Sequence, residues 1–177
     1  GSELGSKTVG IIGTGAIGLR TAQLCKAFGC KVIANAPHPK KEAEGIVEYV
    51  DLETLLKESD IISLHCPLND SSRGLINKER IALMKPTAIV INAARGPVVD
   101  SQALADALNE GRIAGAGIDV FEVEPPLDVN HPLLHSKNTI VTPHVAFASA
   151  ESMEARCHIV FDNITKWLAG EQVNVIL

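Results

Sequence analysis

The stretch VGIIGTGAIGLRTAQLCKAFGCKVIAN, residues 9–35, decides the fold of this chain. Residues 9–12 are Val, Gly, Ile and Ile, and this short apolar run predicts a buried strand. The glycine-rich turn 13–18 follows directly, and the run from there to Phe28 predicts a helix. A second apolar strand is expected over 31–34. A strand, a tight turn, a helix and another strand in this order predict the βαβ unit of an open α/β sheet.

The turn over residues 13–18 reads GTGAIG and fits the pattern G-x-G-x-x-G. Between a strand and a helix, this pattern indicates a dinucleotide site, because glycines let the backbone approach a pyrophosphate and the helix N-terminus attracts it. A tight turn that only packs helix on strand is the alternative. The helix is expected to turn Ile17, Leu24 and Phe28 inward. The expected pyrophosphate contacts are Gly13, Gly15, Ala16, Ile17 and Gly18.

Strands and helices continue to alternate along the rest of the chain. Further strands are expected over residues 47–50, 61–64, 88–91, 114–120 and 139–141. Helices are expected after an N-cap at Asp51, over 78–84, from an N-cap at Asp100 to Gly111, and over about 149–168. The pattern predicts a doubly wound, mostly parallel Rossmann sheet of about seven strands with helices on both faces. Apolar residues at 46% and aromatics at 3% suit such an interior.

Composition also argues against several classes of protein. The formal charge is −5 and basic clusters are absent, which argues against a nucleic-acid surface. No apolar run approaches the roughly 20 residues that span a bilayer, and no signal peptide is recognisable. The four cysteines have no C-x-x-C spacing, so they predict free thiols in a reducing, cytoplasmic compartment and no metal site. They are Cys25, Cys30, Cys66 and Cys157.

Three segments are expected along the chain. Residues 1–6 are interpreted as a linker or cloning remnant, and residues 7–148 as the dinucleotide-binding domain. Residues 149–177 are expected to form a C-terminal helix and tail that would rejoin a second domain.

Polar side chains follow three of the expected strands, at the edge where open α/β sheets bind their ligands. They are Arg95, Glu124 and His144. A guanidinium can hold a carboxylate and polarise a carbonyl, and a histidine can deliver a proton near neutral pH when a carboxylate raises its pKa. The alternatives are a loop arginine, a solvated glutamate and a structural histidine. The other histidines have no comparable setting, although His65 lies beside the expected dinucleotide.

Five ordered motifs cover most of the chain: VGIIGTGAIG, DIISLHCPLN, GLINKERIALMKPTAIVINAARGPVVD, AGIDVFEVEPP and IVTPHVAFAS. In these motifs the chain resembles the nucleotide-binding domain of the D-isomer-specific 2-hydroxyacid dehydrogenases, such as glycerate or hydroxypyruvate reductases and phosphoglycerate dehydrogenases. The resemblance implies that Arg95 binds the substrate carboxylate and carbonyl, that His144 is the general acid/base and that Glu124 is its partner. It also implies cofactor contacts from Cys66, Pro67, Ala93 and Asp119.

The resemblance implies a small 2-hydroxy or 2-oxo acid as substrate and a homodimer, with the loop 122–138 as part of the contact. Phe147 hints at small hydroxy acids, because glycerate and hydroxypyruvate reductases often have an aromatic residue there. Such enzymes usually carry a second domain, and this chain starts just before the first strand of the nucleotide domain. We therefore expect it to bind cofactor but to turn over slowly or not at all.

One departure from the pattern concerns the cofactor. A ribose-binding Asp is expected at the end of the second strand, where Ala36 stands instead. Asn35 can still bond a ribose hydroxyl, while His38, Lys40 or Lys41 can reach a phosphate. The segment favours NADP, or weak discrimination, over strict use of NAD.

Two other functions remain as alternatives. One is an NAD(H)-sensing binding module of the corepressor type, which keeps the same three polar residues without turnover. The other is a different NAD-dependent enzyme of similar fold, such as an adenosylhomocysteine hydrolase.

Overall fold

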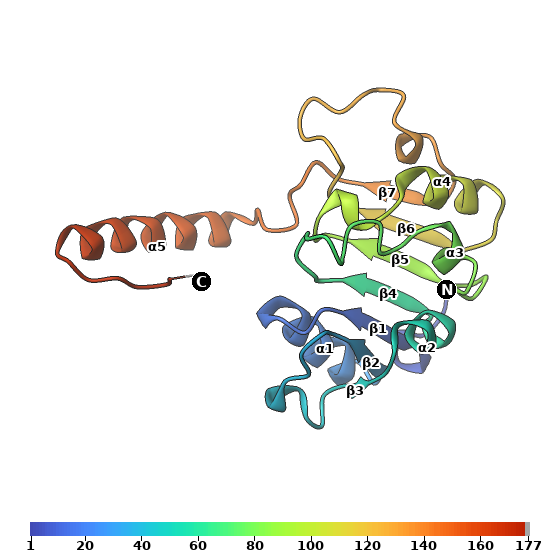
Figure 1. Cartoon of the computed structure of the whole chain (residues 1–177), viewed down its shortest axis with the longest axis horizontal. Coiled ribbons are helices and arrows are strands. Elements are labelled where there is room, and N and C mark those ends of the chain that lie inside the picture. The colour runs from blue at the N-terminus through green and yellow to red at the C-terminus, as the bar shows by residue number, and fades with distance from the viewer. Residues whose placement is uncertain (176–177) are drawn as a thin grey trace. The chain divides into compact units, whose positions relative to one another are not determined.

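The computed structural model describes residues 1–175 and divides the chain into two compact units, Gly1–Pro143 and His144–Leu177. Within the described range, the first unit holds a seven-stranded sheet in the order β3-β2-β1-β4-β5-β6-β7, with every pair parallel (Figure 1). The strands are β1 (Thr8–Ile12), β2 (Lys31–Asn35), β3 (Glu48–Tyr49), β4 (Ile61–Leu64), β5 (Ile89–Asn92), β6 (Gly115–Ile118) and β7 (Thr139–Val141). The predicted doubly wound α/β fold is confirmed.

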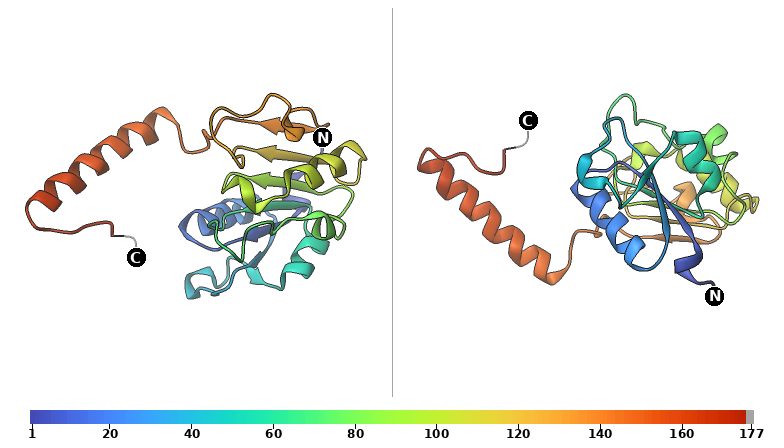
Figure 2. Two further views of the ribbon diagram at one scale, coloured as in Figure 1. Left: turned by 45° about the horizontal axis from the view of Figure 1, so that its top comes forward. Right: turned by 90° about the horizontal axis from the view of Figure 1, so that it is seen from below.

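The helices of this unit lie on both faces of the sheet (Figure 2). The chain runs outward from β1 to β2 and then returns across β1 to β4 and beyond, so right-handed connections place α1 on one face and the later helices on the other. The helices are α1 (Ala16–Ala27), α2 (Leu52–Glu58), α3 (Lys78–Ile81) and α4 (Ser101–Asn109). Single 3-10 turns occur at η1 (Leu4–Ser6), η2 (Lys41–Ala43), η3 (Gly96–Val98) and η4 (Pro132–Leu134).

Two hydrophobic clusters lie on opposite sides of the sheet. Successive residues of a strand alternate between them: Ile11 packs in the smaller cluster with Ala22 of α1, and Ile12 packs in the larger one under α2–α4. On β5, Val90 points to the larger cluster and is fully buried, whereas Ile89 and Ile91 point to the face that carries α1 and remain 40% and 37% exposed. Helices therefore cover the α1 face over β1 and β2 but leave it partly exposed over β5.

The predicted helix ends have the expected capping bonds. Asp51 and Asp100 accept hydrogen bonds from backbone N–H groups at the starts of α2 and α4 (2.9 and 3.0 Å). Gly111, at φ +70°, follows α4, and the N–H of Arg112 reaches back to the carbonyl of Ala107 (2.8 Å). These bonds fix where α2 and α4 begin and where α4 ends.

The predicted inward face of α1 is wrong. Ile17 and Phe28 are 74% and 67% exposed, and Leu24 is also exposed, whereas the buried residues of the helix are Gly18 and Ala22. A Cβ at Gly18 would overlap the carbonyl of Gly13, so only a stripe of small residues lets the helix approach the sheet this closely. Close approach at the turn therefore decided the orientation, against the larger apolar stripe.

Three predicted elements were too long. The helix expected over 78–84 ends at Ile81, the strand over 114–120 is reduced to Gly115–Ile118, and the strand over 47–50 to Glu48–Tyr49. The differences are only one to three residues at an end, and Val50, Ala114 and Asp119 still donate backbone hydrogen bonds to the neighbouring segments outside the paired residues.

The second unit contains α5 (Ala150–Leu168), capped by Ser149 and Ser152 in a reciprocal pair of hydrogen bonds. None of its residues is buried, and its exposed apolar side chains include Phe161, Ile164, Trp167 and Leu168. Among the residues described, no helix is long and apolar enough to cross a membrane.

Asp60 ties together the amino-terminal ends of three strands. Its carboxylate accepts hydrogen bonds from the backbone N–H of Thr8 and from Nζ of Lys85, both at 2.9 Å, and its own carbonyl accepts from the N–H of Ile89. The bond from Thr8, followed by the Lys85 contact, holds the pKa of Asp60 below its usual range despite partial burial.

We expect Asp60→Asn to destabilise the chain by about 1.5–3 kcal/mol at pH 7, because charge-assisted hydrogen bonds are lost. The pKa of Asp60 in the folded chain lies below its unfolded value of about 3.9. The contribution of Asp60 to the free energy of unfolding is therefore complete above the unfolded pKa and disappears as the pH falls through the folded pKa. Urea unfolding at a series of pH values from 7 down into the acid range measures this. A difference in stability between the two chains that does not shrink as the pH falls would contradict it. Lys57→Gln, which removes an exposed ion pair with Glu53, is the control.

Candidate functional site

The three glycines of the turn after β1 have three different surroundings. Gly13 has φ +97°, and a Cβ there would lie 2.6 Å from the carbonyl oxygen of His65. Gly18 permits the close contact of α1 with the turn, whereas a Cβ on Gly15 would meet nothing within 4 Å. A dinucleotide-binding turn needs this division: one glycine for the turn, one for approach of the pyrophosphate and one for helix packing.

Gly15 is also the N-cap of α1, and it has no side chain that could bond the first amides of the helix. The amides of Ala16, Ile17 and Gly18 precede the first intrahelical bond, which runs from the N–H of Leu19 to the carbonyl of Gly15 (2.9 Å), and they lie at the positive end of the helix. The open side of Gly15 therefore lies beside backbone donors that suit an anion. These residues fit the pyrophosphate of a dinucleotide.

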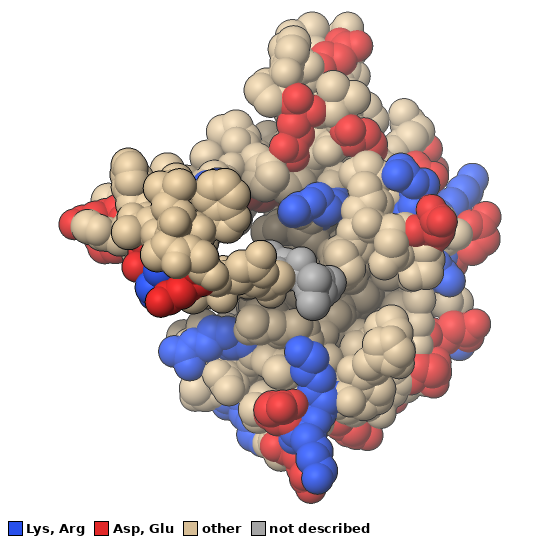
Figure 3. Space-filling view, turned by 60° about the vertical axis from the view of Figure 1, so that its left-hand side comes forward, with Lys and Arg blue, Asp and Glu red and all other residues tan. Residues whose placement is uncertain are grey.

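The segment after β2 lies beside this turn. The N–H of Gly13 donates to the carbonyl of Asn35 (2.9 Å), while the amide nitrogen of Asn35 donates to the carbonyl of Val50 (2.9 Å). Ala36 is half-buried, and the basic side chains that follow, His38, Lys40 and Lys41, are exposed. Basic and acidic side chains are interspersed on the face shown in Figure 3. The segment 35–41 itself contains no acid.

The end of β4 supplies the next part of the edge. Nε2 of His65 lies 2.9 Å from the hydroxyl of Ser63, and burial lowers the pKa of His65. Cys66 is half-buried, which raises the pKa of its thiol, and Pro67 follows. Sequence reasoning missed Ser63, since a serine inside an apolar strand gives no sign of its partner.

Arg95 lies on a loop that a buried asparagine holds in place. Asn92, at the end of β5 and 1% exposed, accepts from the N–H of Ala94 and donates to the carbonyl of Arg95, both at 3.0 Å. Ala93 and Arg95 are exposed beside it, and Nη1 of Arg95 donates to the carbonyl of Ala94 (2.6 Å). Asn92 was not predicted as a site residue, although an Asn two residues before a turn is a recognisable side-chain turn signal.

The loops after β5 and β6 touch each other. A Cβ on Gly96 would overlap the backbone carbonyl of Phe121. Asp119, 5% exposed, donates its N–H to the carbonyl of Asn92 (2.9 Å) and accepts from the hydroxyl of Thr142 (2.5 Å). The ends of β5, β6 and β7 are thus linked by direct contacts.

The loop that carries Glu124 contains a carboxylate–histidine pair that sequence reasoning passed over. Oε2 of Glu122 lies 3.0 Å from Nε2 of His131, whose Nδ1 accepts from the N–H of Leu133. Burial pushes the pKa of Glu122 upward, but hydrogen bonds from Ser101 and His131 outweigh it and leave the pKa lowered. Glu124 is exposed on the same loop.

His144 belongs to the second unit and has φ +55°, an uncommon conformation for a residue with a side chain. Its ring packs edge-on against Phe147, with centroids 5.9 Å apart, and the guanidinium carbon of Arg156 lies 5.3 Å from the centroid of Phe147. The convergence of His144 with Arg95 and Glu124 stays a prediction. All other predicted site residues lie at or after the carboxyl ends of strands of the first unit.

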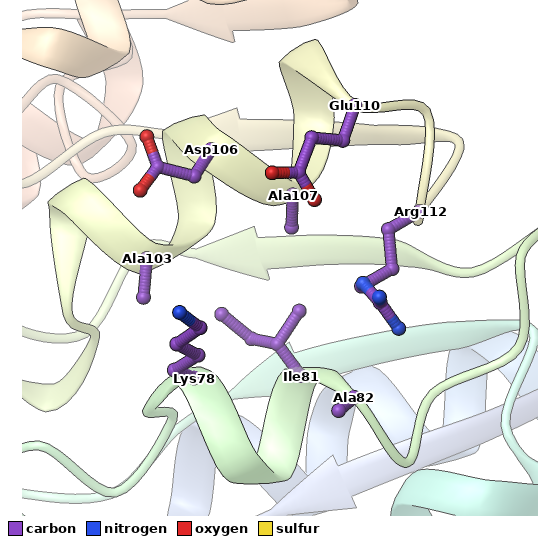
Figure 4. Close-up of a pocket in the computed structure, with 8 residues that line it drawn as sticks. All are labelled: Lys78, Ile81, Ala82, Ala103, Asp106, Ala107, Glu110 and Arg112. Carbon is purple, nitrogen blue, oxygen red and sulfur yellow. The ribbon is translucent and has the colours of Figure 1, made fainter.

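A pocket of about 280 Å³ lies elsewhere, between α3 and α4 (Figure 4). Lys78 and Arg112 line it together with Asp106 and Glu110. Arg112 precedes β6, so the pocket extends toward the amino edge of the sheet, opposite to the edge that carries the predicted site residues.

Comparison with known proteins identifies relatives over nearly the whole chain. Residues 1–146 match the family model "D-isomer specific 2-hydroxyacid dehydrogenase, NAD binding domain". The hydroxypyruvate reductase of Blautia hydrogenotrophica is 44% identical over 98% of this chain and 54% of its own length. The glyoxylate reductase of Aeropyrum pernix is 46% identical over 97% of this chain and 51% of its own.

A solved structure agrees with these relatives. The D-lactate dehydrogenase of Lactobacillus jensenii with NAD+ superposes with a TM-score of 0.91 at 38% identity, over 99% of this chain and 57% of that one. The chain thus spans about half the length of the relatives that it matches. These comparisons give the corepressor alternative no support, and the adenosylhomocysteine hydrolase alternative is wrong. The chain belongs to the D-isomer-specific 2-hydroxyacid dehydrogenase family and corresponds to its NAD-binding domain.

Proposed function

We propose that this chain binds a nicotinamide dinucleotide and serves hydride transfer between it and a D-2-hydroxy acid or the matching 2-oxo acid. The observation that carries the proposal is the turn over residues 13–18, where Gly15 is open and Gly13 and Gly18 are each required by a close contact. Neither a positive φ nor a close contact requires a glycine at position 15, and a ligand that occupies its open side explains the residue.

Arg95, Glu124 and His144 are the residues that we assign to the reaction. The exposed guanidinium of Arg95 would hold the substrate carboxylate and carbonyl oxygen through its planar fork. His144 would give a proton to the substrate oxygen during reduction and take it back during oxidation, with Glu124 raising its pKa. The nicotinamide, when bound, supplies or accepts the hydride.

The remaining predicted residues are proposed to contact the cofactor. The turn would bind the pyrophosphate, the segment after β2 the adenosine ribose, and Asp119 the nicotinamide amide. The proposed contacts are Gly13, Gly15, Ala16, Ile17, Gly18, Asn35, Ala36, His38, His65, Cys66, Pro67, Ala93 and Asp119.

We propose NADP, or weak discrimination between NADP and NAD, because Ala36 provides no carboxylate and Lys40 and Lys41 are exposed beside it. Fluorescence titration with NADPH and NADH should give equal or tighter binding of NADPH. Ala36→Asp should shift the ratio of dissociation constants toward NADH by about tenfold, through repulsion of the 2′-phosphate. Binding of NADH at least tenfold tighter than NADPH by the unmodified chain would overturn the preference.

We expect small 2-oxo acids as substrates, of which glyoxylate, hydroxypyruvate and pyruvate are examples. Phe147 is the residue that points to small hydroxy acids.

We also propose that the protein is cytoplasmic and forms a homodimer. The free thiols support the reducing compartment. The exposed Val123 and Val129 on the loop 122–138 support the dimer contact. Sedimentation equilibrium tests the dimer, since it reports mass independently of shape.

The reaction is tested by His144→Asn in the longest natural chain that contains this sequence. Loss of the general acid/base should lower turnover of 2-oxo acids by about 100-fold or more, with the dissociation constant for the dinucleotide unchanged. His158→Asn, an exposed histidine on α5, is the matched control and should keep full turnover. Normal turnover by His144→Asn would overturn the assignment.

A further inference from the structure

Tyr49 occupies an unusual place at the carboxyl edge of the sheet. It ends the short strand β3 and pairs in register with Ala34 of β2. Its hydroxyl donates to Oγ1 of Thr14 (2.9 Å) and accepts from the backbone N–H of Lys40 (3.1 Å). One phenolic oxygen therefore uses both its donor and its acceptor capacity to join two separate segments.

The two segments are those that would contact different parts of a dinucleotide. Thr14, 3% exposed, stands between Gly13 and Gly15 in the turn that suits the pyrophosphate. Lys40 follows the ribose-side segment and precedes the 3-10 turn η2. The Tyr49 hydroxyl thus fixes the position of one segment relative to the other.

The segment between β2 and η2 has few other means of being held. Pro37 and Pro39 have no backbone N–H, which leaves Ala36, His38 and Lys40 as the only residues of 36–40 with a backbone donor. Just before it, the side-chain amide of Asn35 donates to the carbonyl of Val50, the residue after β3 (2.9 Å). The bond from Lys40 to Tyr49 is the corresponding anchor at the other end of the segment.

We infer that Tyr49 is a positioning residue for dinucleotide selection, an inference that rests on the proposed function. Its hydroxyl holds Lys40, and with it the neighbouring Lys41, at a fixed place relative to the pyrophosphate turn. A 2′-phosphate on the adenosine ribose is an anion that these cations and backbone donors recognise, whereas the plain ribose of NADH has no such group. Release of the segment therefore weakens NADPH more than NADH.

Tyr49→Phe tests this in the chain as it stands, because the ring remains and only the hydroxyl is lost. The dissociation constant for NADPH should rise by about fivefold to tenfold, and that for NADH by less than about twofold, as for one lost hydrogen bond. Thr14→Val removes the bond that fixes the Tyr49 hydroxyl to the turn but keeps its bond to Lys40, so NADPH should again be weakened more than NADH, by no more than in Tyr49→Phe. The double variant should be no worse than Tyr49→Phe alone, because both changes act through the same hydroxyl.

Hydrogen exchange in the chain without cofactor provides a second readout, independent of binding. The Lys40 amide should exchange faster in Tyr49→Phe than in the unmodified chain, because its acceptor is gone. Thr87→Val, which removes an exposed hydroxyl before β5 at the opposite edge of the sheet, is the matched control for both readouts. Neither its dissociation constants nor its Lys40 exchange should change.

Equal weakening of NADPH and NADH in Tyr49→Phe, or unchanged exchange at Lys40, would overturn the inference and leave the proposed function standing. If Tyr49→Phe fails to fold, the ratio of the dissociation constants for NADPH and NADH is measured in Thr14→Val instead, and an unchanged ratio would overturn the inference. Binding of neither dinucleotide by the unmodified chain would instead overturn the proposed function.

Discussion

Gly15→Val should abolish dinucleotide binding in a chain that still folds. The backbone of Gly15, at φ −67° and ψ −176°, is open to any L-residue, and the added carbons meet no neighbour within 4 Å at the Cβ position. The cost to the fold is then that of a poor N-cap, about 1 kcal/mol. The same carbons would occupy the space beside the amides of α1, so we expect at least about a 100-fold loss of affinity.

The test is a graded series at this one position. Gly15→Ala adds one carbon and Gly15→Val adds three, so the affinity for NADH and NADPH should fall in steps while the thermal midpoint falls by only about 2–4 °C, as expected for a loss of about 1 kcal/mol. Isothermal titration and thermal unfolding measure the two quantities on the same samples. Full affinity in Gly15→Val would show that the pyrophosphate does not approach this turn.

Gly96→Ala should produce the opposite result, a large loss of stability. The added Cβ would overlap the backbone carbonyl of Phe121, and backbone atoms cannot move aside as the end of a flexible side chain can. We expect a loss of about 3 kcal/mol, the upper range for overpacking, together with displacement of the Arg95 loop from the loop after β6.

Gly117→Ala is the matched control for this variant, because a Cβ on Gly117 of β6 meets nothing within 4 Å. Urea unfolding should give the control a free energy of unfolding equal to that of the unmodified chain or slightly higher, since alanine lowers the entropy of the unfolded chain. Equal stabilities of Gly96→Ala and Gly117→Ala would refute the contact between the two loops.

Much of the fold could be predicted because apolar runs, glycines and capping residues act locally. Asp51 and Asp100 mark helix starts by side chains that bond their own backbone, and Gly13 marks the turn after β1. The orientation of α1 could not be predicted, because two stripes of the helix were apolar. Only the carbonyl of Gly13 beneath Gly18 selects the stripe of small residues.

The site was predictable where it depends on strand ends and less so where it depends on side-chain partners. Parallel strands bring their carboxyl ends to one edge, and this placed Arg95 and Asp119 together with the glycine turn. Asn92 bonds within its own loop and was overlooked although its turn signal is local. Tyr49 and the pair of Glu122 with His131 instead depend on contacts between residues 9 to 35 positions apart. Such contacts leave no periodic or local signal in the sequence.

The predicted domain boundary between residues 148 and 149 stays a prediction, as does the role of His144. Both depend on how the residues after β7 meet the rest of the protein, which periodicity does not encode. The positive φ of His144 shows that the backbone adopts an uncommon conformation at this point of the chain.

The unequal surroundings of the three turn glycines have an evolutionary consequence. Gly13 and Gly18 are required by the folded chain itself, through a positive φ and close contacts, so selection for a stable protein alone preserves them. Gly15 has neither constraint and contributes only about 1 kcal/mol as an N-cap, so a bound ligand is the main reason to preserve it. In a descendant that kept the fold but gave up the dinucleotide, Gly15 would be the first of the three to change.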